Sequence, residues 1–299
     1  MTVFRAPPEP RIIPALGGMS LQRLSERHIE EFLYKLRTAG GAAGKPLSAR
    51  SVRNTLVVLN EALKQAKRLK LIARNPCAEI EPPKIDAQPQ PQWTPDEAKR
   101  FLALLEGERY GVLYVLTLTT GLRRSEVLGL RWQDLDLDAG VLHVRQKLVE
   151  IKGKLQFGNK TKTPSGRRDI ELHPRVVQLL SEHRKKQLAQ RLAAGPRWVG
   201  AGDGGELVFS TPQGKPLYPR NVYRRLTQLI DQAGLTRTGL HGMRRTASSI
   251  AHDETKDLLA AARMLGHSQP DVAAKHYARA SDEATRLAAQ AVGRAYFGE

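Results

Sequence analysis

The spacing of apolar residues predicts helices through most of the first 80 residues. Between Ser25 and Leu36 the apolar side chains recur at helical intervals, and Ser25 is a suitable N-cap. After a break rich in glycine, a second helix begins at Ser48 or Ser51. One of its faces is apolar at spacings of three and four, and it carries Val52, Leu56, Leu59, Leu63 and Ala66. This pattern predicts a small helical domain.

Prolines separate this helical part from the rest of the chain. Four of the ten residues from Pro82 to Pro91 are proline, and the interior of a helix does not tolerate them. We therefore predict a semi-rigid linker at residues 82–91. It divides an N-terminal domain of residues 1–81 from a second domain of residues 92–299.

The second domain begins as helix and then changes its period. Thr94 to Glu97 combines a capping threonine, an early proline and an acidic first turn. Residues 110–119 are apolar enough for a buried helix, which Gly121 ends. From residue 141 an alternating pattern predicts strands of a small antiparallel sheet that ends at Leu172, and the chain after it is mostly helical. The expected fold class is mainly α with a small antiparallel β-sheet (α+β).

The charge of the chain points to its partner. Forty-eight Lys and Arg against 30 Asp and Glu give a net charge of +18, spread along the sequence. The positive side chains repel one another, so we expect a polyanionic partner, with nucleic acid ahead of an acidic membrane surface. A merely basic protein is the alternative.

The cysteine content and the hydropathy of the chain indicate its cellular compartment. Cys77 is the only cysteine, which excludes an internal disulfide and a cysteine-based metal cluster. The first ten residues lack the apolar segment of a signal peptide. The longest apolar stretch, residues 111–122, is shorter than the roughly 20 residues that cross a bilayer. We expect a cytoplasmic protein that acts on DNA and not on a membrane.

The first cluster suited to phosphate chemistry surrounds Arg123. Gly121 permits a sharp turn, so Arg123 emerges at a helix junction, and Glu126 is placed to hold its guanidinium. A fixed guanidinium matches two phosphate oxygens. Taken alone, however, an Arg–Glu pair on a helix is more often structural.

The second cluster contains lysines. Lys160 and Lys162 precede Pro164-Ser165, and we expect this segment at the tip of a β-hairpin. From such a tip a lysine can reach bound DNA and give a proton to a leaving oxygen. A solvated loop lysine is the structural alternative.

The third cluster contains histidines and a tyrosine. His241 and Arg244 are three residues apart, so on a helix they share a face. Gly266 is expected to end a helix and to place His267 on a turn, and Tyr277 falls about two turns into the next helix. Taken singly, His267 is more typical of a capping or packing residue and Tyr277 of a half-buried aromatic. The spacing of the histidines fits no common zinc site, so we expect no bound metal.

Together these clusters resemble the tyrosine recombinase family, the phage-integrase type of site-specific recombinases. Thr120-Gly121-Leu122-Arg123-x-x-Glu126, followed by Leu130-x-Trp132-x-Asp134, is similar to the segment with that family's first catalytic arginine. Residues 162–168 resemble the hairpin with its catalytic lysine. The His-x-x-Arg element, the second histidine and the nucleophile correspond to His241-x-x-Arg244, Leu265-Gly266-His267 and Tyr277. Residues 21–80 resemble the helical core-binding domain, which contributes to a two-domain clamp around DNA.

The resemblance implies a reaction that needs no cofactor and no metal. The nucleophile attacks a backbone phosphorus and forms a 3′-phosphotyrosine with a free 5′-hydroxyl. The two arginines and the second histidine stabilise the phosphate, the first histidine accepts the tyrosine proton, and a lysine protonates the 5′-oxygen. The implied catalytic residues are Arg123, Lys162, His241, Arg244, His267 and Tyr277, with Lys160 as the alternative lysine.

The resemblance also implies partners. We expect double-stranded DNA with two recombination sites, a homotetramer assembled on it, accessory DNA-bending or directionality factors, and a role in integration or excision of a mobile element. The alternatives are a type IB topoisomerase-like enzyme and a catalytically impaired DNA-binding remnant.

Residues 11–17 resemble the middle of a core-binding domain, so we expect a natural short form or a truncated start. The tail from Ala288 to Phe297 packs either on a neighbouring protomer or on its own domain.

Overall fold

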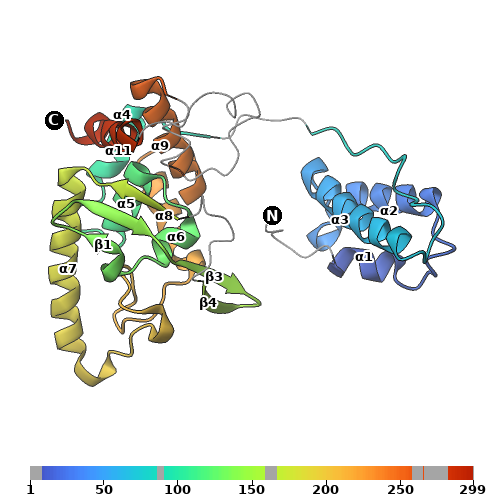
Figure 1. Cartoon of the computed structure of the whole chain (residues 1–299), viewed down its shortest axis with the longest axis horizontal. Coiled ribbons are helices and arrows are strands. Elements are labelled where there is room, and N and C mark those ends of the chain that lie inside the picture. Colours follow the sequence, from blue (N-terminus) through green and yellow to red (C-terminus); the bar gives the residue numbers. More distant parts are fainter. Residues whose placement is uncertain (1–8, 86–90, 159–166, 258–264, 266–281, 299) are drawn as a thin grey trace. The chain divides into compact units, whose positions relative to one another are not determined.

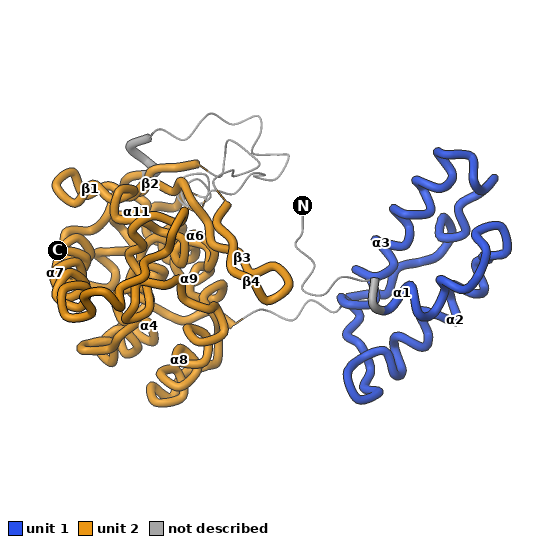
Figure 2. Tube along the Cα trace, turned by 90° about the horizontal axis from the view of Figure 1, so that it is seen from below, with its two compact units in different colours: residues 1–89 blue, residues 90–299 orange. Residues whose placement is uncertain are grey.

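The chain forms two compact units. The computed structural model describes residues 9–85, 91–158, 167–257, 265 and 282–298. Unit 1 comprises Met1–Pro89 and unit 2 comprises Gln90–Glu299 (Figure 2). Each unit has its own hydrophobic core.

Unit 1 is helical. It contains α1 (Glu9–Leu16), α2 (Glu26–Ala39), the 3₁₀ turn η1 (Ala42–Gly44) and α3 (Ala49–Arg68). Ser25 is the N-cap of α2, and Ser48, one of the two expected caps, accepts a hydrogen bond from the Ser51 amide at the start of α3. The apolar faces predicted for α2 and α3 are buried against each other, because each amphipathic helix has one stripe to remove from water.

Unit 2 combines helices with two small sheets (Figure 1). Its α-helices are α4 (Pro95–Ala103), α5 (Gly111–Thr120), α6 (Arg124–Leu128), α7 (Pro174–Ala194), α8 (Pro219–Gln232), α9 (Leu240–Thr255) and α11 (Asp282–Phe297). Its 3₁₀ turns are η2 (Trp132–Asp134), η4 (Gly195–Arg197) and η5 (Gly202–Gly204). The expected fold class, mainly α with small antiparallel sheets, is confirmed.

Helix α5 lies at the centre of this unit. Nine of its ten residues are buried, and it packs against α4, α7, α9 and α11. A helix that is apolar on all sides is stable only in such an interior. Its buried threonines are satisfied internally, because the hydroxyls of Thr117 and Thr120 donate to the carbonyls of Leu113 and Leu116 at 2.8 and 2.5 Å. The buried helix expected at residues 110–119 is therefore confirmed.

The strands form two antiparallel sheets instead of the single sheet that the sequence predicted. One sheet has the order β1-β2-β5, from β1 (Leu135–Asp136), β2 (Val141–Val144) and β5 (Arg168–Glu171). The other is a hairpin of β3 (Lys147–Ile151) and β4 (Lys154–Gly158). In the described residues β4 pairs with β3 while β5 pairs with β2, so the two strands that flank residues 159–166 belong to different sheets.

The hairpin that the structure describes does not include residues 160–165, which were expected at a hairpin tip and lie outside the described residues. Its tip is the two-residue turn Lys152-Gly153, where φ is +51° and +78°. Positive φ at both positions suits the twist of the flanking strands and favours glycine at the second. Lys160 and Lys162 follow β4 in sequence and lie outside the described residues.

The C-terminal helix α11 packs on its own unit. It contacts α9, α5, α4 and β5, and its buried residues include Ala288, Val292 and Tyr296. Its backbone comes close to His173, since a Cβ on Gly293 would lie 2.5 Å from the His173 Cβ. Of the two arrangements expected for the tail, the structure has the self-packed one. No helix in the described ranges has both the length and the apolar character to cross a membrane.

Candidate active site

Arg123 lies where α5 ends and α6 begins. Gly121 ends α5 in the left-handed conformation, with φ +62°, and Arg123 is the N-cap of α6 with extended backbone. The Arg123 amide donates to Glu126 Oε2 at 2.8 Å, and its guanidinium Nη1 donates to Glu126 Oε1 at 2.8 Å. The predicted helix junction and the predicted Arg123–Glu126 pair are both confirmed. The Arg123 side chain is 40% exposed, so it can reach a ligand while one edge is held.

Gly121 is required by close packing as well as by its backbone. A Cβ at this position would lie 2.2 Å from Leu265 Cδ2, and Leu265 is fully buried. The Gly121 carbonyl also accepts a hydrogen bond of 2.6 Å from Arg244 Nη1. Gly121 thus ends α5, leaves room for the Leu265 side chain and accepts a hydrogen bond from Arg244.

Gly121→Ala is expected to lower the free energy of unfolding by about 2–4 kcal/mol, because it combines unfavourable φ with overpacking against Leu265. Denaturant unfolding measures this loss. Gly107→Ala is the matched control, since Gly107 also has positive φ (+72°) but no atom within 4 Å of a Cβ. We expect the control to lose only about 1 kcal/mol; equal losses in the two variants would contradict the packing argument.

Arg244 is buried in the first half of α9. The residue is 3% exposed, and Nη2 donates to the Leu265 carbonyl at 2.6 Å while Nη1 donates to the Gly121 carbonyl. Burial and then the nearby Arg123 guanidinium lower its pKa to about 9, so it stays protonated at neutral pH. His241 lies three residues earlier on the same helix, but it is exposed whereas Arg244 is buried.

Glu126 joins two arginines. Arg168 from β5 donates to its carboxylate from both terminal guanidinium nitrogens, Nη2 to Oε2 at 2.9 Å and Nη1 to Oε1 at 3.3 Å. Burial raises the pKa of Glu126, but the charge and hydrogen bonds of Arg168, followed by those of Arg123, outweigh it and lower the pKa to about 2. The carboxylate is therefore ionised throughout the physiological range.

Sequence reasoning gave Arg168 no role. It lies 42 residues from Glu126, and only the pairing of β5 with β2 brings it to the α5–α6 junction. In the sheet Arg168 pairs with Val144 of β2, and this pairing cannot be read from the sequence around either residue. With Arg123 and Arg244, it gives the cluster three guanidiniums against one carboxylate, an excess that favours an anion.

Three expected site residues are not placed. Lys162, His267 and Tyr277 lie outside the described residues, as does the alternative Lys160. The structure brings together Arg123 and Arg244, and it places His241 on the helix that carries Arg244. Within the described part of the chain, no three His, Cys, Asp or Glu side chains gather as a potential metal site.

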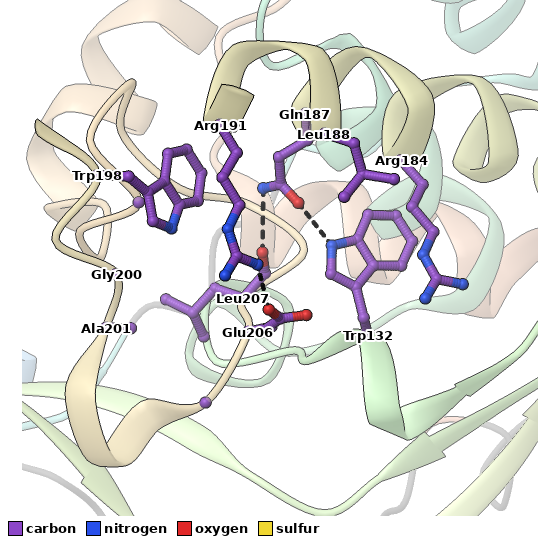
Figure 3. A pocket seen from close by; sticks show the side chains of 12 residues that line it. Trp132, Arg184, Gln187, Leu188, Arg191, Trp198, Gly200, Ala201, Glu206 and Leu207 are labelled. Atoms are coloured by element: carbon purple, nitrogen blue, oxygen red, sulfur yellow. Dashed lines mark hydrogen bonds and ion pairs between the residues drawn. The ribbon is translucent and has the colours of Figure 1, made fainter. Parts of the chain in front are cut away.

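Trp132, which belongs to the Leu130-x-Trp132-x-Asp134 motif, lines a separate pocket of about 80 Å³ (Figure 3). Its indole nitrogen donates to Gln187 Oε1 at 2.6 Å, and Arg184 lies over its ring. Opposite it are Trp198 and Arg191. Among the described candidates for catalysis, neither Arg123, His241 nor Arg244 lines this pocket, and the Trp132–Gln187 hydrogen bond ties η2 to α7.

The solved structures of two recombinases share this fold. The Tn1549 transposon integrase in complex with transposon right end DNA matches with a TM-score of 0.71 and 22% identity, over 93% of this chain and 90% of that one. A lambda integrase dimer bound to a COC′ core site matches with a TM-score of 0.60 and 17% identity, over 92% and 89% of the two chains.

Similar sequences carry consistent names. A XerC-like tyrosine recombinase of Caldanaerobacter subterraneus is 25% identical over 281 residues, covering 88% of this chain and 69% of that protein. An integrase of Streptomyces ambofaciens is 29% identical over 276 residues, covering 89% and 67%. Tyrosine recombinase XerC of Xylella fastidiosa is 30% identical over 229 residues, covering 74% and 67%. The chain thus spans about two thirds of the length of these relatives.

The family model described as the phage integrase family matches residues 92–284. This match covers more than half of the chain and includes the whole arginine cluster around Gly121. The chain belongs to the phage integrase family of tyrosine recombinases, enzymes that cleave and rejoin DNA.

Proposed function

We propose that this tyrosine recombinase cuts and rejoins DNA at specific sites through a 3′-phosphotyrosine on Tyr277, in the integration or excision of a mobile element. The observation that carries the proposal is the proximity of Arg123 and Arg244 at the end of α5, where Arg123 follows Gly121 by two residues and Arg244 donates to the Gly121 carbonyl. These arginines come from different helices, and each is held by protein acceptors. Two fixed guanidiniums at one point suit a phosphate group.

The arginines act on the charge of the phosphate. Arg123 and Arg244 bind its non-bridging oxygens and stabilise the negative charge that grows on them in the transition state. Both are positioned before DNA binds, so little reorganisation is needed at the moment of reaction. We propose that His267 adds a hydrogen bond to the same oxygens.

The covalent step exchanges one P–O bond for another. The Tyr277 oxygen forms a bond to phosphorus, and the bond from phosphorus to the 5′-oxygen breaks. His241 accepts the tyrosine proton, because a phenol with an ordinary pKa of about 10 is a weak nucleophile at neutral pH. Lys162, or alternatively Lys160, protonates the leaving 5′-oxygen. The bond energy remains in the phosphotyrosine ester, so no cofactor is required for the strand to rejoin.

Unit 1 is proposed as the helical core-binding domain, residues 1–81, followed by the linker 82–91 and the catalytic domain 92–299. An exposed basic group at the end of α3 and just beyond it supports DNA binding; it consists of Lys64, Lys67, Arg68, Lys70 and Arg74. Such residues suit a phosphate backbone.

We propose double-stranded DNA with two recombination sites as the substrate and a homotetramer as the active assembly, assisted by DNA-bending or directionality factors. A lambda integrase tetramer bound to a Holliday junction is among the structures of similar fold, with a TM-score of 0.61. Because chromosomal and mobile-element DNA is the proposed substrate, we place its action in the cytoplasm, at the nucleoid.

A nicked suicide substrate tests the function. The wild-type protein is expected to become trapped as a covalent complex with a DNA site taken from the junction of its own element. On two intact sites it is expected to exchange strands, and a supercoil relaxation assay without a paired site should show little turnover. Relaxation without any recombination would favour the type IB topoisomerase-like alternative, and DNA binding without a covalent complex would favour the impaired remnant.

DNA affinity is expected to fall steeply with salt, because each neutralised phosphate contributes a slope of about −0.9 to log K against log salt. A fluorescence-anisotropy titration at several salt concentrations measures this slope. The double variant Lys67→Gln/Arg68→Gln should make the slope shallower by about 1–2 units if both side chains contact phosphates. A flat titration of the wild-type protein would contradict the clamp.

A further inference from the structure

Glu126 is bound unequally by its two arginines. Arg168 uses both terminal guanidinium nitrogens, whereas Arg123 uses Nη1 and its backbone amide. Each carboxylate oxygen thereby accepts two hydrogen bonds.

Arg168, which makes the two-pronged contact with Glu126, is also the more buried of the two arginines. The side chains of Arg168 and Glu126 are 8% and 7% exposed, while that of Arg123 is 40% exposed. Arg168 is therefore the inner partner of the carboxylate, and Arg123 is the outer partner that reaches toward solvent. A phosphate can approach Arg123 without competing with the Arg168–Glu126 pair.

We propose that Arg168 is a positioning residue for strand cleavage, which holds and neutralises Glu126 so that this carboxylate orients Arg123 without cancelling its charge toward the DNA phosphate. Arg168 itself has no contact with DNA in this scheme. The inference rests on the proposed function, since it assigns Arg123 to the scissile phosphate.

The charge balance explains why two arginines are needed. Removing Arg168 leaves a buried carboxylate whose strongest neutralising partner is gone. The remaining anion then draws Arg123 into a fuller pair, because an uncompensated buried charge is strongly unfavourable. Arg123 is thereby turned from the phosphate, and the positive field of the cluster falls.

Arg168→Met tests the role, because it removes the charge and keeps much of the volume. Single-turnover cleavage of the nicked suicide substrate at saturating DNA is expected to slow by about 10- to 100-fold, while DNA affinity changes little. Adding Glu126→Gln to Arg168→Met removes the stranded anion and is expected to restore part of the rate. Arg168→Lys keeps the charge but not the two-pronged geometry, so an intermediate rate is expected.

The pH profile separates a charge role from a purely structural one. The charged described groups that act on Glu126 are Arg123, Arg168 and Arg244. In Arg168→Met, burial is expected to raise the pKa of Glu126, so acidification should neutralise it and release Arg123. The ratio of variant to wild-type cleavage rates is therefore expected to rise as the pH falls.

Arg225→Met is the matched structural control. Arg225 donates to Glu108 from Nε and Nη2 at 3.1 and 2.6 Å, a similar pair that includes none of the proposed site residues. This control should lose stability but retain cleavage within about 3-fold, as expected for a change outside the site.

The outcomes are distinct. A wild-type rate in Arg168→Met, or a folded but slow Arg168→Met that neither Glu126→Gln nor lower pH improves, would overturn the positioning role. If Arg168→Met fails to fold, the comparison of Arg168→Lys with Arg168→Met/Glu126→Gln decides: the inference requires both to cleave, and it is overturned if neither does. Failure of the wild-type protein to form a covalent complex would instead refute the proposed function.

Discussion

Tyr277→Phe is expected to abolish the covalent protein–DNA complex while leaving DNA affinity unchanged. The substitution removes one oxygen, the atom that forms the new bond to phosphorus, and retains the aromatic ring. We expect cleavage to fall by at least about 1000-fold, which corresponds to about 4 kcal/mol of activation free energy. Denaturing gel electrophoresis after incubation with a nicked suicide substrate measures the adduct, and anisotropy measures binding.

Tyr223→Phe provides the matched control. Tyr223 on α8 is 55% exposed and belongs to none of the clusters proposed for catalysis. Its variant should form the adduct at the wild-type rate. A covalent complex with Tyr277→Phe, mapped to another residue, would refute the assignment of the nucleophile.

Arg244→Lys is expected to be the second most damaging substitution. Lysine keeps one positive charge, but its ammonium cannot span the carbonyls of Gly121 and Leu265 and also bind two phosphate oxygens. We expect cleavage to fall by about 100- to 1000-fold, the range for removal of one stabilising donor group. A carbonyl left without a donor should also cost about 1–3 kcal/mol of stability.

Single-turnover cleavage and denaturant unfolding, measured together, separate the two losses. Arg245→Lys is the control on the adjacent residue, where the guanidinium Nη2 donates to the Pro91 carbonyl at 3.1 Å. We expect this control to cleave within about 3-fold of wild type, as for most changes outside a catalytic centre. If Arg244→Lys cleaved equally well, Arg244 would have only a packing role.

Local sequence patterns predicted the elements that carry the site. The predominantly apolar run at residues 110–119 identified a buried helix, and Gly121 identified its end. The spacing of Arg123 and Glu126 predicted their ion pair, which the structure contains at 2.8 Å. These predictions succeeded because helix periodicity, helix ends and pairs three residues apart depend on short-range geometry.

The strand region was harder to predict. Gly153 lies in the turn of the described hairpin and Gly158 ends β4, but these glycines did not show which strands pair. Two sheets are present where one was expected, because β4 pairs with β3 while β5 pairs with β2. Strand pairing depends on contacts between residues distant in sequence, and the alternation of apolar and polar residues within one strand does not identify its partner strand.

By itself the sequence determined the family, the order of the chemical groups and the helical character of both units. It could do so because motif spacing and apolar periodicity are properties of short segments. Only the tertiary structure decided that Arg244 anchors on the carbonyls of Gly121 and Leu265 and that Arg168 shares Glu126 with Arg123. These partners lie 123, 21 and 42 residues apart, and burial makes their hydrogen bonds obligatory once the helices and strands have packed.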